Sequence, residues 1–257
     1  MIPAFLIVFI VSCIFTSVGF YKFAWFLSIG YGLSVAAQGV TLLVLFKSNL
    51  TFVSVVLSLL CVIYGVRLAS FLYMRQKDST FTSNVKPKTE KDPSIFVKIA
   101  MWLPVALLYV LEVSPALFRL QNNKAETIFG IIGIILSGTG VTLEGLADYQ
   151  KSSFKKKNPK AFCNVGLYRF VQHPNYLGEV TFWLGQFVAG IPIYQGFLQW
   201  IAAISGFGLI ALTMLSATSG LEKRQQKSYG DDADYRAYKQ KTPILIPFIP
   251  VYSFGKN

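Results

Sequence analysis

The sequence predicts an all-α membrane protein built as a bundle of seven transmembrane helices. Of its 257 residues, 53% are hydrophobic, and the mean hydropathy is +0.51. A soluble domain of this composition would expose too much apolar surface to water. Several windows exceed 18 apolar residues with few charges, which is the length that a membrane span requires. Each span must be helical, because a lipid-exposed segment has to satisfy its own backbone hydrogen bonds.

We expect the spans at about 2–20, 24–46, 51–74, 95–118, 127–147, 176–193 and 195–217, followed by a tail at 218–257. No basic segment precedes the first span, and no clear small-residue cleavage site follows it. It is therefore interpreted as a retained helix rather than a signal peptide. No long linker or repeat divides the chain, so a single domain over 1–257 is expected.

The formal net charge of +12 is concentrated in three segments that a seven-helix count places on one side of the membrane. The basic residues are Arg75, Lys77, Lys86, Lys88 and Lys91; Lys151, Lys155, Lys156, Lys157, Lys160 and Arg169; and Lys223, Arg224, Lys227, Arg236, Lys239, Lys241 and Lys256. The positive-inside rule then puts the tail in the cytoplasm and the N-terminus outside. Topology and attraction to anionic lipid explain such a distribution. Alternatively, some of these groups bind a polyanionic cofactor; a nucleic-acid partner is not expected.

Metal and disulfide chemistry have little support in the sequence. The three cysteines, Cys13, Cys61 and Cys163, show neither metal-ligand spacing nor a disulfide framework, and there is one histidine. No P-loop or dinucleotide fingerprint is present. The pair Gly138 and Gly140 lies inside a predicted span and is interpreted as helix packing. A nucleotide site would have to be built from helix ends and loops.

Polar side chains within the predicted spans are functional candidates, because burying them in lipid is costly. They are Gln38, Tyr64, Arg67, Glu112, Glu144, Asp148 and Glu179. Each has a simpler alternative. Gln38 could join two helices by a hydrogen bond, Tyr64 could be an interface aromatic, and Arg67 could extend toward the headgroups. Glu112 could lie near the outer interface, and Glu179 could favour the positive end of its helix.

Residues 166–179, with the sequence G-L-Y-R-F-V-Q-H-P-N-Y-L-G-E, concentrate polar chemistry at the start of a predicted span. Pro174 is suited to a first helical turn, and His173 precedes it. Asn175 and Glu179 are four residues apart and share a helix face. The segment also carries Tyr168, Arg169 and Tyr176. It is well placed to bind an amphipathic cofactor.

The tail carries a second polar and aromatic group. Glu222, Lys223 and Arg224 follow the last span, and Tyr229, Tyr235 and Tyr238 come next. An apolar T-P-I-L-I-P-F-I-P at 242–250 ends the group. We expect a cytoplasmic helix that returns its proline-rich end to the membrane surface. A plain lipid-associated tail is the alternative.

Four segments carry a family resemblance: Y-G-V-R-L at 64–68, A-D-Y-Q-K at 147–151, H-P-N-Y-L-G-E at 173–179, and Y-R-A-Y-K-Q-K-T-P-I-L-I-P-F-I-P at 235–250. They resemble the steroid 5α-reductase family, and best its reductase-like, mostly microbial branch. That branch is related to the isoprenylcysteine carboxyl methyltransferases. The resemblance is strong over about 140–250, weaker over 60–75 and only topological before that.

The resemblance implies a seven-helix enzyme that uses NADPH to reduce a carbon–carbon double bond conjugated to a ketone in a lipophilic, steroid-like or other lipid substrate. It implies that Tyr64 hydrogen-bonds the substrate carbonyl, with Gln38 standing where the family has a glutamate partner. The expected cofactor contacts are Asn175, Glu179, Asp148, Lys151, Arg67, Arg75, Tyr168, Arg169, His173, Arg224, Tyr235 and Tyr238. The family histidine of the tail has no counterpart, since Glu222–Arg224 stand there.

The expected chemistry is physically reasonable. Hydride addition to an enone places negative charge on the carbonyl oxygen, and a tyrosine hydroxyl in a low-dielectric pocket stabilises that charge. The cofactor supplies the hydride, while the protein positions it and excludes water. The substrate would enter from the bilayer, in a bacterial inner membrane or the endoplasmic reticulum.

Two other function classes stay open. The related methyltransferases also carry Y-R-x-x-x-H-P-x-Y-x-G and a similar ending, so an S-adenosylmethionine-dependent methyltransferase is one alternative, with His173 and Glu222 on the cofactor. A non-catalytic lipid-binding membrane protein is the other.

Overall fold

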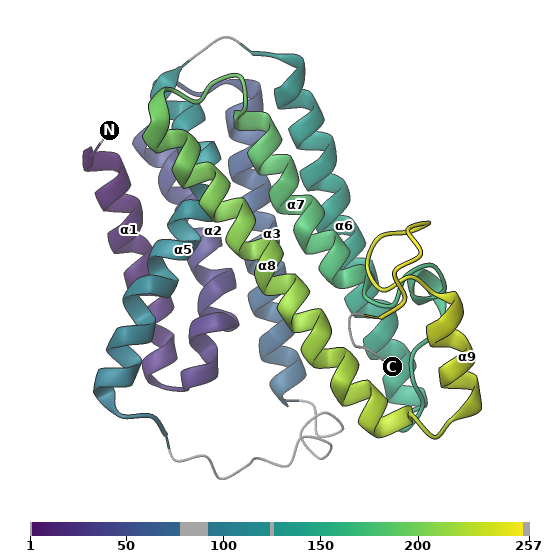
Figure 1. The fold of residues 1–257 in the computed structure, drawn as a ribbon. Helices are drawn as coiled ribbons and strands as arrows, with labels where there is room; N and C mark the ends of the chain where they lie inside the picture. The colour runs from purple at the N-terminus through teal and green to yellow at the C-terminus, as the bar shows by residue number, and fades with distance from the viewer. Residues whose placement is uncertain (1, 78–91, 124–125, 254–257) are drawn as a thin grey trace. The chain divides into compact units, whose positions relative to one another are not determined.

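The computed structural model describes residues 2–77, 92–123 and 126–253, and the regular secondary structure in this part of the chain is all helical (Figure 1). It contains eight α-helices: α1 (Ile2–Thr16), α2 (Ile29–Leu45), α3 (Phe52–Lys77), α5 (Ile95–Asn122), α6 (Ile128–Lys157), α7 (Pro174–Gly190), α8 (Gly196–Tyr229) and α9 (Ala233–Lys241). Short 3₁₀ helices cover Ser17–Phe20, Phe23–Leu27 and Gly166–Arg169. The predicted all-α class is confirmed. Of the basic residues named above, Lys86, Lys88, Lys91 and Lys256 lie outside the described residues.

Among the described residues, five helical segments are long and apolar enough to cross a membrane: Pro3–Phe20, α3, α5, α6 and α8. The chain is therefore a multi-pass integral membrane protein. The apolar helix α2 has only 17 residues, and the 17-residue α7 is not one of the five. The count of seven spans and the orientation of the N-terminus stay predictions.

The helices do not coincide with the expected spans, for two physical reasons. The expected span 24–46 is interrupted at Ser28, whose φ of −135° and ψ of −94° lie outside the helical region, and the α-helix begins only at Ile29. In contrast, α6 and α8 continue past the expected ends at 147 and 217, to Lys157 and Tyr229. The 34 residues of α8 extend about 50 Å, whereas the hydrocarbon core is about 30 Å thick. Hydropathy detects where the lipid ends, but the helix does not end there.

The chain divides into two compact units, one of residues 1–137 and 184–209 and the other of residues 138–183 and 210–257. The single domain predicted over 1–257 stays a prediction.

Glycines let α2 and α3 cross closely in the first unit. A Cβ on Gly32 would lie 2.6 Å from the Gly65 carbonyl oxygen, and one on Gly39 would lie 2.7 Å from the Ser58 carbonyl oxygen. Such contacts are possible only without a side chain, and small residues are typical of membrane helix interfaces. The crossing also brings together the neighbours of Gly32 and Gly65, which are Tyr31 and Tyr64.

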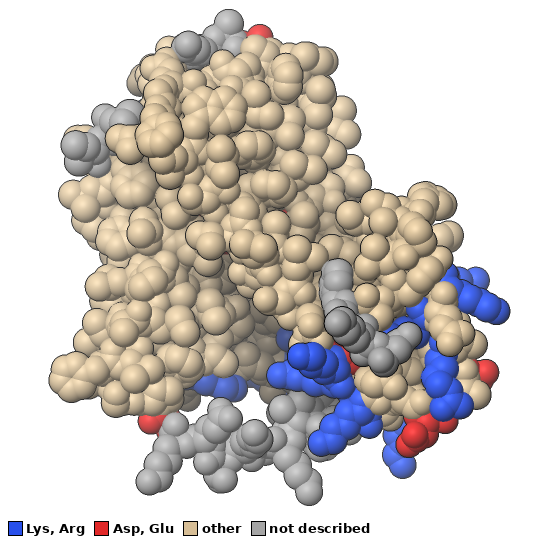
Figure 2. Space-filling view, in the orientation of Figure 1, with Lys and Arg blue, Asp and Glu red and all other residues tan. Residues whose placement is uncertain are grey.

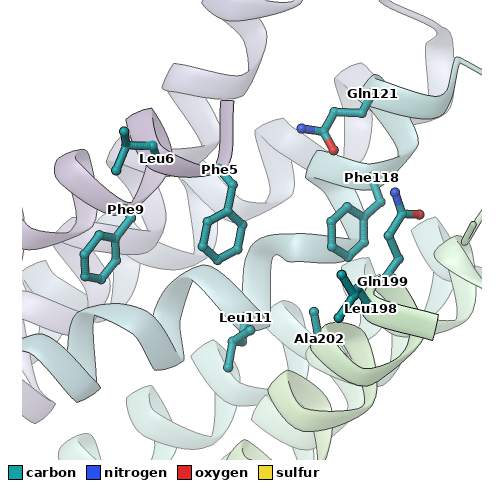
Figure 3. A pocket seen from close by; sticks show the side chains of 9 residues that line it. All are labelled: Phe5, Leu6, Phe9, Leu111, Phe118, Gln121, Leu198, Gln199 and Ala202. Carbon is teal, nitrogen blue, oxygen red and sulfur yellow. The ribbon is translucent and has the colours of Figure 1, made fainter. Parts of the chain in front are cut away.

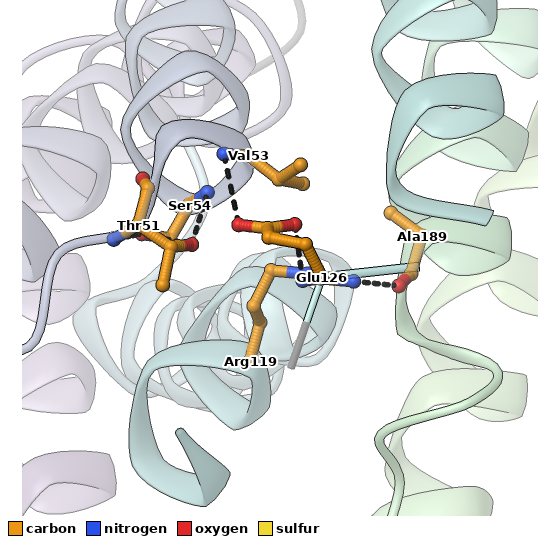
Figure 4. A network of polar contacts seen from close by, with 6 residues as sticks. All are labelled: Thr51, Val53, Ser54, Arg119, Glu126 and Ala189. Atoms are coloured by element: carbon orange, nitrogen blue, oxygen red, sulfur yellow. Dashed lines mark hydrogen bonds and ion pairs between the residues drawn. The ribbon is translucent and has the colours of Figure 1, made fainter. Parts of the chain in front are cut away.

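A polar network joins three helices in the same unit (Figure 4). The Arg119 guanidinium, 3% exposed, donates to the Ala189 carbonyl oxygen at 2.8 Å and contacts the Glu126 carboxylate at 3.3 Å. Glu126 in turn accepts a hydrogen bond from the Val53 amide, at 3.2 Å, in the first turn of α3. The network therefore satisfies backbone groups that helix ends leave without a partner and ties α3, α5 and α7 together.

In the second unit, α6 and α7 are in backbone contact. A Cβ on Gly140 would lie 2.3 Å from the Phe182 nitrogen, and one on Gly178 would lie 2.6 Å from the Glu144 nitrogen. This confirms Gly140 as a packing residue, whereas a Cβ on Gly138 would meet no atom of the described residues within 4 Å. The pairs Gly140–Phe182 and Gly178–Glu144 run in opposite directions, so the helices are antiparallel here.

We predict that Gly140→Val lowers the melting temperature of the detergent-purified protein, because the added atoms force α6 and α7 apart. Overpacking of this kind costs about 1–3 kcal/mol. Gly138→Val is the matched control and should leave the melting temperature near that of the wild type. Equal melting temperatures for the two variants would show that the close contact is not needed for stability.

We also predict that Arg119→Leu destabilises the protein by about 3 kcal/mol, the lower end for breaking a buried ion pair, because Glu126 is partly exposed. Glu126→Gln should cost less, since its amide oxygen can still accept from Val53. The check is equilibrium unfolding of the purified protein. A stability of Arg119→Leu equal to that of the wild type would contradict the role of the network.

Candidate functional site

A cavity of about 210 Å³ lies in the second unit, among the ends of α6 and α8, α9, and the loop that precedes α7. Its lining combines cationic, aromatic and amide side chains. The residues are Lys151, Lys155, Phe162, Cys163, Tyr168, Gln172, Leu221, Arg224, Gln225, Ser228, Tyr229, Tyr235 and Tyr238. The structure thus brings together five predicted cofactor contacts: Lys151, Tyr168, Arg224, Tyr235 and Tyr238.

Local hydrogen bonds place Tyr168 in this wall. Gly166, at φ +60°, turns the chain into the short 3₁₀ helix Gly166–Arg169. The amide of Leu167 donates to the Gln150 side-chain oxygen at 2.8 Å, which fixes this turn against α6. The Tyr238 hydroxyl donates to the Tyr168 carbonyl oxygen at 2.7 Å, which fixes it against α9.

One wall of the cavity is aromatic. The Phe162 ring lies 5.3 Å from the ring of Tyr235, 5.4 Å from that of Tyr238 and 6.1 Å from that of Tyr229, measured between centroids. Helix α9 supplies two of these rings, and Asp232 caps its first turn by accepting from the amide of Asp234 at 2.8 Å. The wall offers flat apolar faces on which a planar heterocycle can stack.

Two buried hydroxyl groups in the lining have unused hydrogen-bonding capacity. Tyr168 is 2% exposed and Tyr235 is 1% exposed, and neither hydroxyl has a hydrogen-bond partner in residues 2–77, 92–123 and 126–253. Burial raises the pKa of both phenols, so both are protonated at neutral pH. Buried polar groups in proteins are nearly always hydrogen-bonded. A polar ligand in the cavity would supply the missing partners.

The cations of the cavity are held in place. The Lys151 ammonium lies 5.5 Å from the centroid of the Tyr168 ring. The Lys155 ammonium donates to the Tyr229 hydroxyl at 2.7 Å and to the carbonyl oxygens of Ala161 and Pro159 at 2.6 and 3.3 Å. Lys155 therefore contributes fixed positive charge rather than an available donor. Together with Arg224 they make the cavity attractive to an anion.

His173 is completely buried at the start of α7, and its ring stacks on Tyr176 with centroids 5.7 Å apart. Within the described ranges neither ring nitrogen has a hydrogen-bond partner. Burial, reinforced by the charge of Lys151 and opposed by Glu222, lowers the pKa of His173 to about 3. The imidazole is therefore neutral, and one of its nitrogens can accept a hydrogen bond.

Helix α7 begins at Pro174, as predicted, and carries Asn175 and Glu179 on one face. Asn175 is half-buried, and its side-chain oxygen has no hydrogen-bond partner in the part of the chain that the structure describes. Glu179 and Asp148 are buried, whereas Arg169 and Arg224 are exposed. The burial of these side chains neither supports nor contradicts their predicted roles as cofactor contacts, which stay predictions.

The predicted catalytic pair lies in the first unit. Tyr64 is fully buried and donates its hydroxyl to that of Tyr31 at 3.1 Å, and the Tyr31 ring stacks on Tyr109 with centroids 4.6 Å apart. Gln38, also fully buried, donates to the Ser34 hydroxyl at 2.9 Å. The burial of Tyr64 argues against the alternative of an interface aromatic, whereas the alternative of a helix-joining hydrogen bond for Gln38 stays open. The catalytic roles of both residues stay predictions.

Two predicted arginine contacts of the cofactor are also in the first unit, on α3. The Arg67 guanidinium lies 5.8 Å from the centroid of the Tyr64 ring, and that of Arg75 lies 5.4 Å from the Phe71 ring. Arg67 is half-buried, and Arg75 is exposed.

Several residues of the cavity were not predicted as contacts. Lys155 follows Lys151 by one helical turn, and this spacing could have indicated it. Phe162 and Gln172 had no such signal, because both gain their roles from the folding of the tail. The Gln172 side-chain amide donates to the Thr242 carbonyl oxygen at 2.7 Å. The backbone amide of Gln172 donates to the Pro243 carbonyl oxygen at 2.9 Å.

The first unit holds a different, apolar groove of about 360 Å³ (Figure 3). It is lined by Phe5, Leu6 and Phe9 of α1, Leu111, Phe118 and Gln121 of α5, and Leu198, Gln199 and Ala202 of α8. With almost no polar surface and walls from membrane-spanning helices, it suits hydrocarbon rather than a charged cofactor.

A model of the family described as "Protein of unknown function (DUF1295)" matches residues 8–242. The chain belongs to this family. The match covers every residue of the cavity in this DUF1295 protein. Comparisons with curated proteins and with solved structures gave no match.

We predict that His173 makes this DUF1295 protein sensitive to mild acid. Its folded pKa, about 3, lies below the ordinary value of 6.5. As the pH falls below 6.5, the unfolded chain binds a proton that the folded chain does not, so stability is lost. This difference in proton binding lowers the free energy of unfolding by about 1 kcal/mol between pH 7 and pH 5.5.

The measurement is the melting temperature across this pH range for the wild type and for His173→Gln. The chain has one histidine, so no other imidazole contributes to the difference. The variant should lose less stability than the wild type on acidification. Identical pH slopes would contradict the buried neutral imidazole.

Proposed function

We propose that this DUF1295 protein is a membrane-embedded reductase that uses NADPH to reduce the double bond of a lipophilic α,β-unsaturated ketone. The observation that carries the proposal is the basic and aromatic cavity of the second unit, with buried hydroxyls that have no hydrogen-bond partner among the described residues. The resemblance to the steroid 5α-reductase family supplies the reaction class.

The residues of the cavity fit the nucleotide end of NADPH. Phe162 and the tyrosines of α9 offer faces for an adenine ring, and Lys151 and Arg224 offer charge for phosphates. The hydroxyls of Tyr168 and Tyr235 offer hydrogen bonds to ribose or phosphate oxygens. The volume of about 210 Å³ is below the roughly 300–1,000 Å³ of pockets that enclose a whole ligand. The cavity therefore suits one end of a dinucleotide.

When bound, NADPH supplies the hydride. The protein's own contribution to the chemical step is the stabilisation of the negative charge that develops on the carbonyl oxygen. Tyr64 is suited to this, because its hydroxyl is buried among apolar helices, where a hydrogen bond to an oxyanion is strong. A hydroxyl can turn, so Tyr31 can donate to Tyr64 while Tyr64 donates to the substrate. Gln38, on the same helix as Tyr31, would help to order this group.

S-adenosylmethionine fits the cavity less well. It carries a sulfonium cation and no phosphate, and the lining holds Lys151, Lys155 and Arg224. Glu222, which a methyltransferase would place on the cofactor, instead forms an ion pair with Lys239 at 2.8 Å and accepts a hydrogen bond from Ser253. These contacts give Glu222 a structural role in joining α8 to α9 and the tail.

We predict that NADPH raises the melting temperature of the protein in lipid nanodiscs and that S-adenosylmethionine does not. A ligand at one hundred times its Kd stabilises the folded state by about 2.7 kcal/mol. Lys151→Gln should weaken NADPH binding, because it removes a charge beside Tyr168. Lys157→Gln, at the exposed end of the same helix, is the matched control.

Stabilisation by S-adenosylmethionine but not by NADPH would contradict the reductase proposal and support a methyltransferase. Stabilisation by neither compound would leave a non-catalytic membrane protein.

We further predict that Tyr64→Phe lowers the turnover of a lipophilic enone about 10²–10³-fold, the loss seen when one oxyanion donor is removed. NADPH affinity should be unchanged. Tyr73→Phe, on the exposed face of the same helix, is the control. Wild-type turnover in Tyr64→Phe would exclude this residue from the mechanism.

A further inference from the structure

Residues 243–252, with the sequence P-I-L-I-P-F-I-P-V-Y, fold into a closed apolar loop, here called the hook. The amide of Ile244 donates to the Val251 carbonyl oxygen at 2.8 Å, which closes the base. Within the hook, the amide of Ile249 donates to the Ile246 carbonyl oxygen at 3.3 Å. Apart from the Tyr252 hydroxyl, the hook has no polar side chain.

Gln172 clamps the base of the hook to the start of α7. Its side-chain amide donates to the carbonyl oxygens of Thr242 and Tyr252 at 2.7 and 3.1 Å, one on each side of the loop. Gln172 is 3% exposed, so these bonds are shielded from water. Just beyond the hook, Ser253 donates to the Glu222 carboxylate of α8. The base is therefore fixed within the second unit.

The tip of the hook points its apolar side chains outward. At the base, Ile244 and Leu245 are 2% and 7% exposed, whereas Phe248 at the tip is 97% exposed and Ile246 is 49% exposed. Phe248 has a φ of +67°, in the left-handed region that bulky side chains rarely adopt. Such strain persists only where the surroundings hold it, and it is typical of functional positions. Contact with water would not offset the free energy that this backbone strain costs at an exposed phenylalanine.

The base of the hook is level with the part of α6 where apolar residues give way to basic ones. Gly178 contacts the backbone of Glu144, and α7 runs antiparallel to α6. Pro174, one turn earlier on α7, is therefore level with Asp148, one turn later on α6. Lys151 and then Lys155–Lys157 follow on α6. Because Gln172 directly precedes this level, the base of the hook lies beside a change from apolar to basic residues, which is typical of the boundary between lipid and water.

Basic side chains gather on α8 and α9, the helices that precede the hook. Figure 2 shows Lys and Arg gathered over α9 and the end of α8. The exposed residues are Lys223, Lys227, Arg236 and Lys241, and Lys239 is half-buried. Basic side chains beside an apolar insertion are typical of segments that bind the interface of an anionic membrane.

We propose that the hook inserts its tip into the interface of the membrane in which the protein resides, with Phe248 among the acyl chains and the neighbouring basic side chains on anionic headgroups. The occupant of this surface is lipid. The insertion holds the tail beside α9, whose Tyr235 and Tyr238 form a wall of the cavity. The proposal does not depend on which ligand the cavity binds.

The test is fluorescence quenching by brominated lipids of the full chain in nanodiscs of phosphatidylcholine and phosphatidylglycerol. A tryptophan is introduced by Phe248→Trp or, as the matched control, by Asp231→Trp in the exposed turn between α8 and α9. The four native tryptophans contribute equally to both variants. We expect several-fold greater quenching of the added emission in Phe248→Trp, and more quenching with phosphatidylglycerol than without it. Quenching of Phe248→Trp no greater than that of Asp231→Trp overturns the proposal.

Hydroxyl-radical footprinting of the wild-type protein in the same nanodiscs covers the case in which the variants misfold. Phe248 should be oxidised as slowly as side chains within the membrane spans. Oxidation of Phe248 at the rate of a water-exposed aromatic side chain also overturns the proposal.

Discussion

The backbone contact between α6 and α7 is the constraint on which the candidate site depends. Lipid surrounds apolar side chains as favourably as a neighbouring helix does, so helices in a membrane associate through close packing rather than the hydrophobic effect. Gly140 and Gly178 allow this close packing, since a Cβ on either residue would overlap the backbone of the other helix. Helix α7 begins four residues before Gly178. The same contact therefore fixes how far along α6 His173 and Gln172 lie, and with them the tail that Gln172 holds.

The second feature of the site is polar capacity that the protein itself does not use. The Tyr168 and Tyr235 hydroxyls and the His173 ring nitrogens are buried, yet they lack hydrogen-bond partners among the described residues. Leaving such groups unpaired costs free energy, so a fold that keeps them is suited to a ligand that pairs them. The fixed charge of Lys155 and the nearby Lys151 select an anionic ligand over a cationic one.

Hydropathy predicted the membrane class and most helices, because a span must be apolar over a length that the bilayer imposes. It could not predict that α6 and α8 continue to Lys157 and Tyr229, since a helix can leave the lipid without ending. It also missed the break at Ser28, where no proline signals it.

The site shows a similar division. Tyr168, Lys151, Arg224 and the tyrosines of α9 were expected near one cofactor, and the structure gathers them around one cavity. Gln172 was not foreseen, because its contacts reach residues 70 and 80 positions later. No local pattern encodes contacts of that range, and they exist only once the tail has folded back.

Photo-crosslinking with an azido-adenine analogue of NADP, followed by peptide mapping of the wild-type protein, tests the central claim most directly. The account predicts that the label attaches to peptides containing Phe162, Tyr229, Tyr235 or Tyr238, the aromatic wall of the cavity, and that excess NADPH suppresses it. Labelling confined to residues 2–77, or labelling that NADPH does not suppress, would contradict the account.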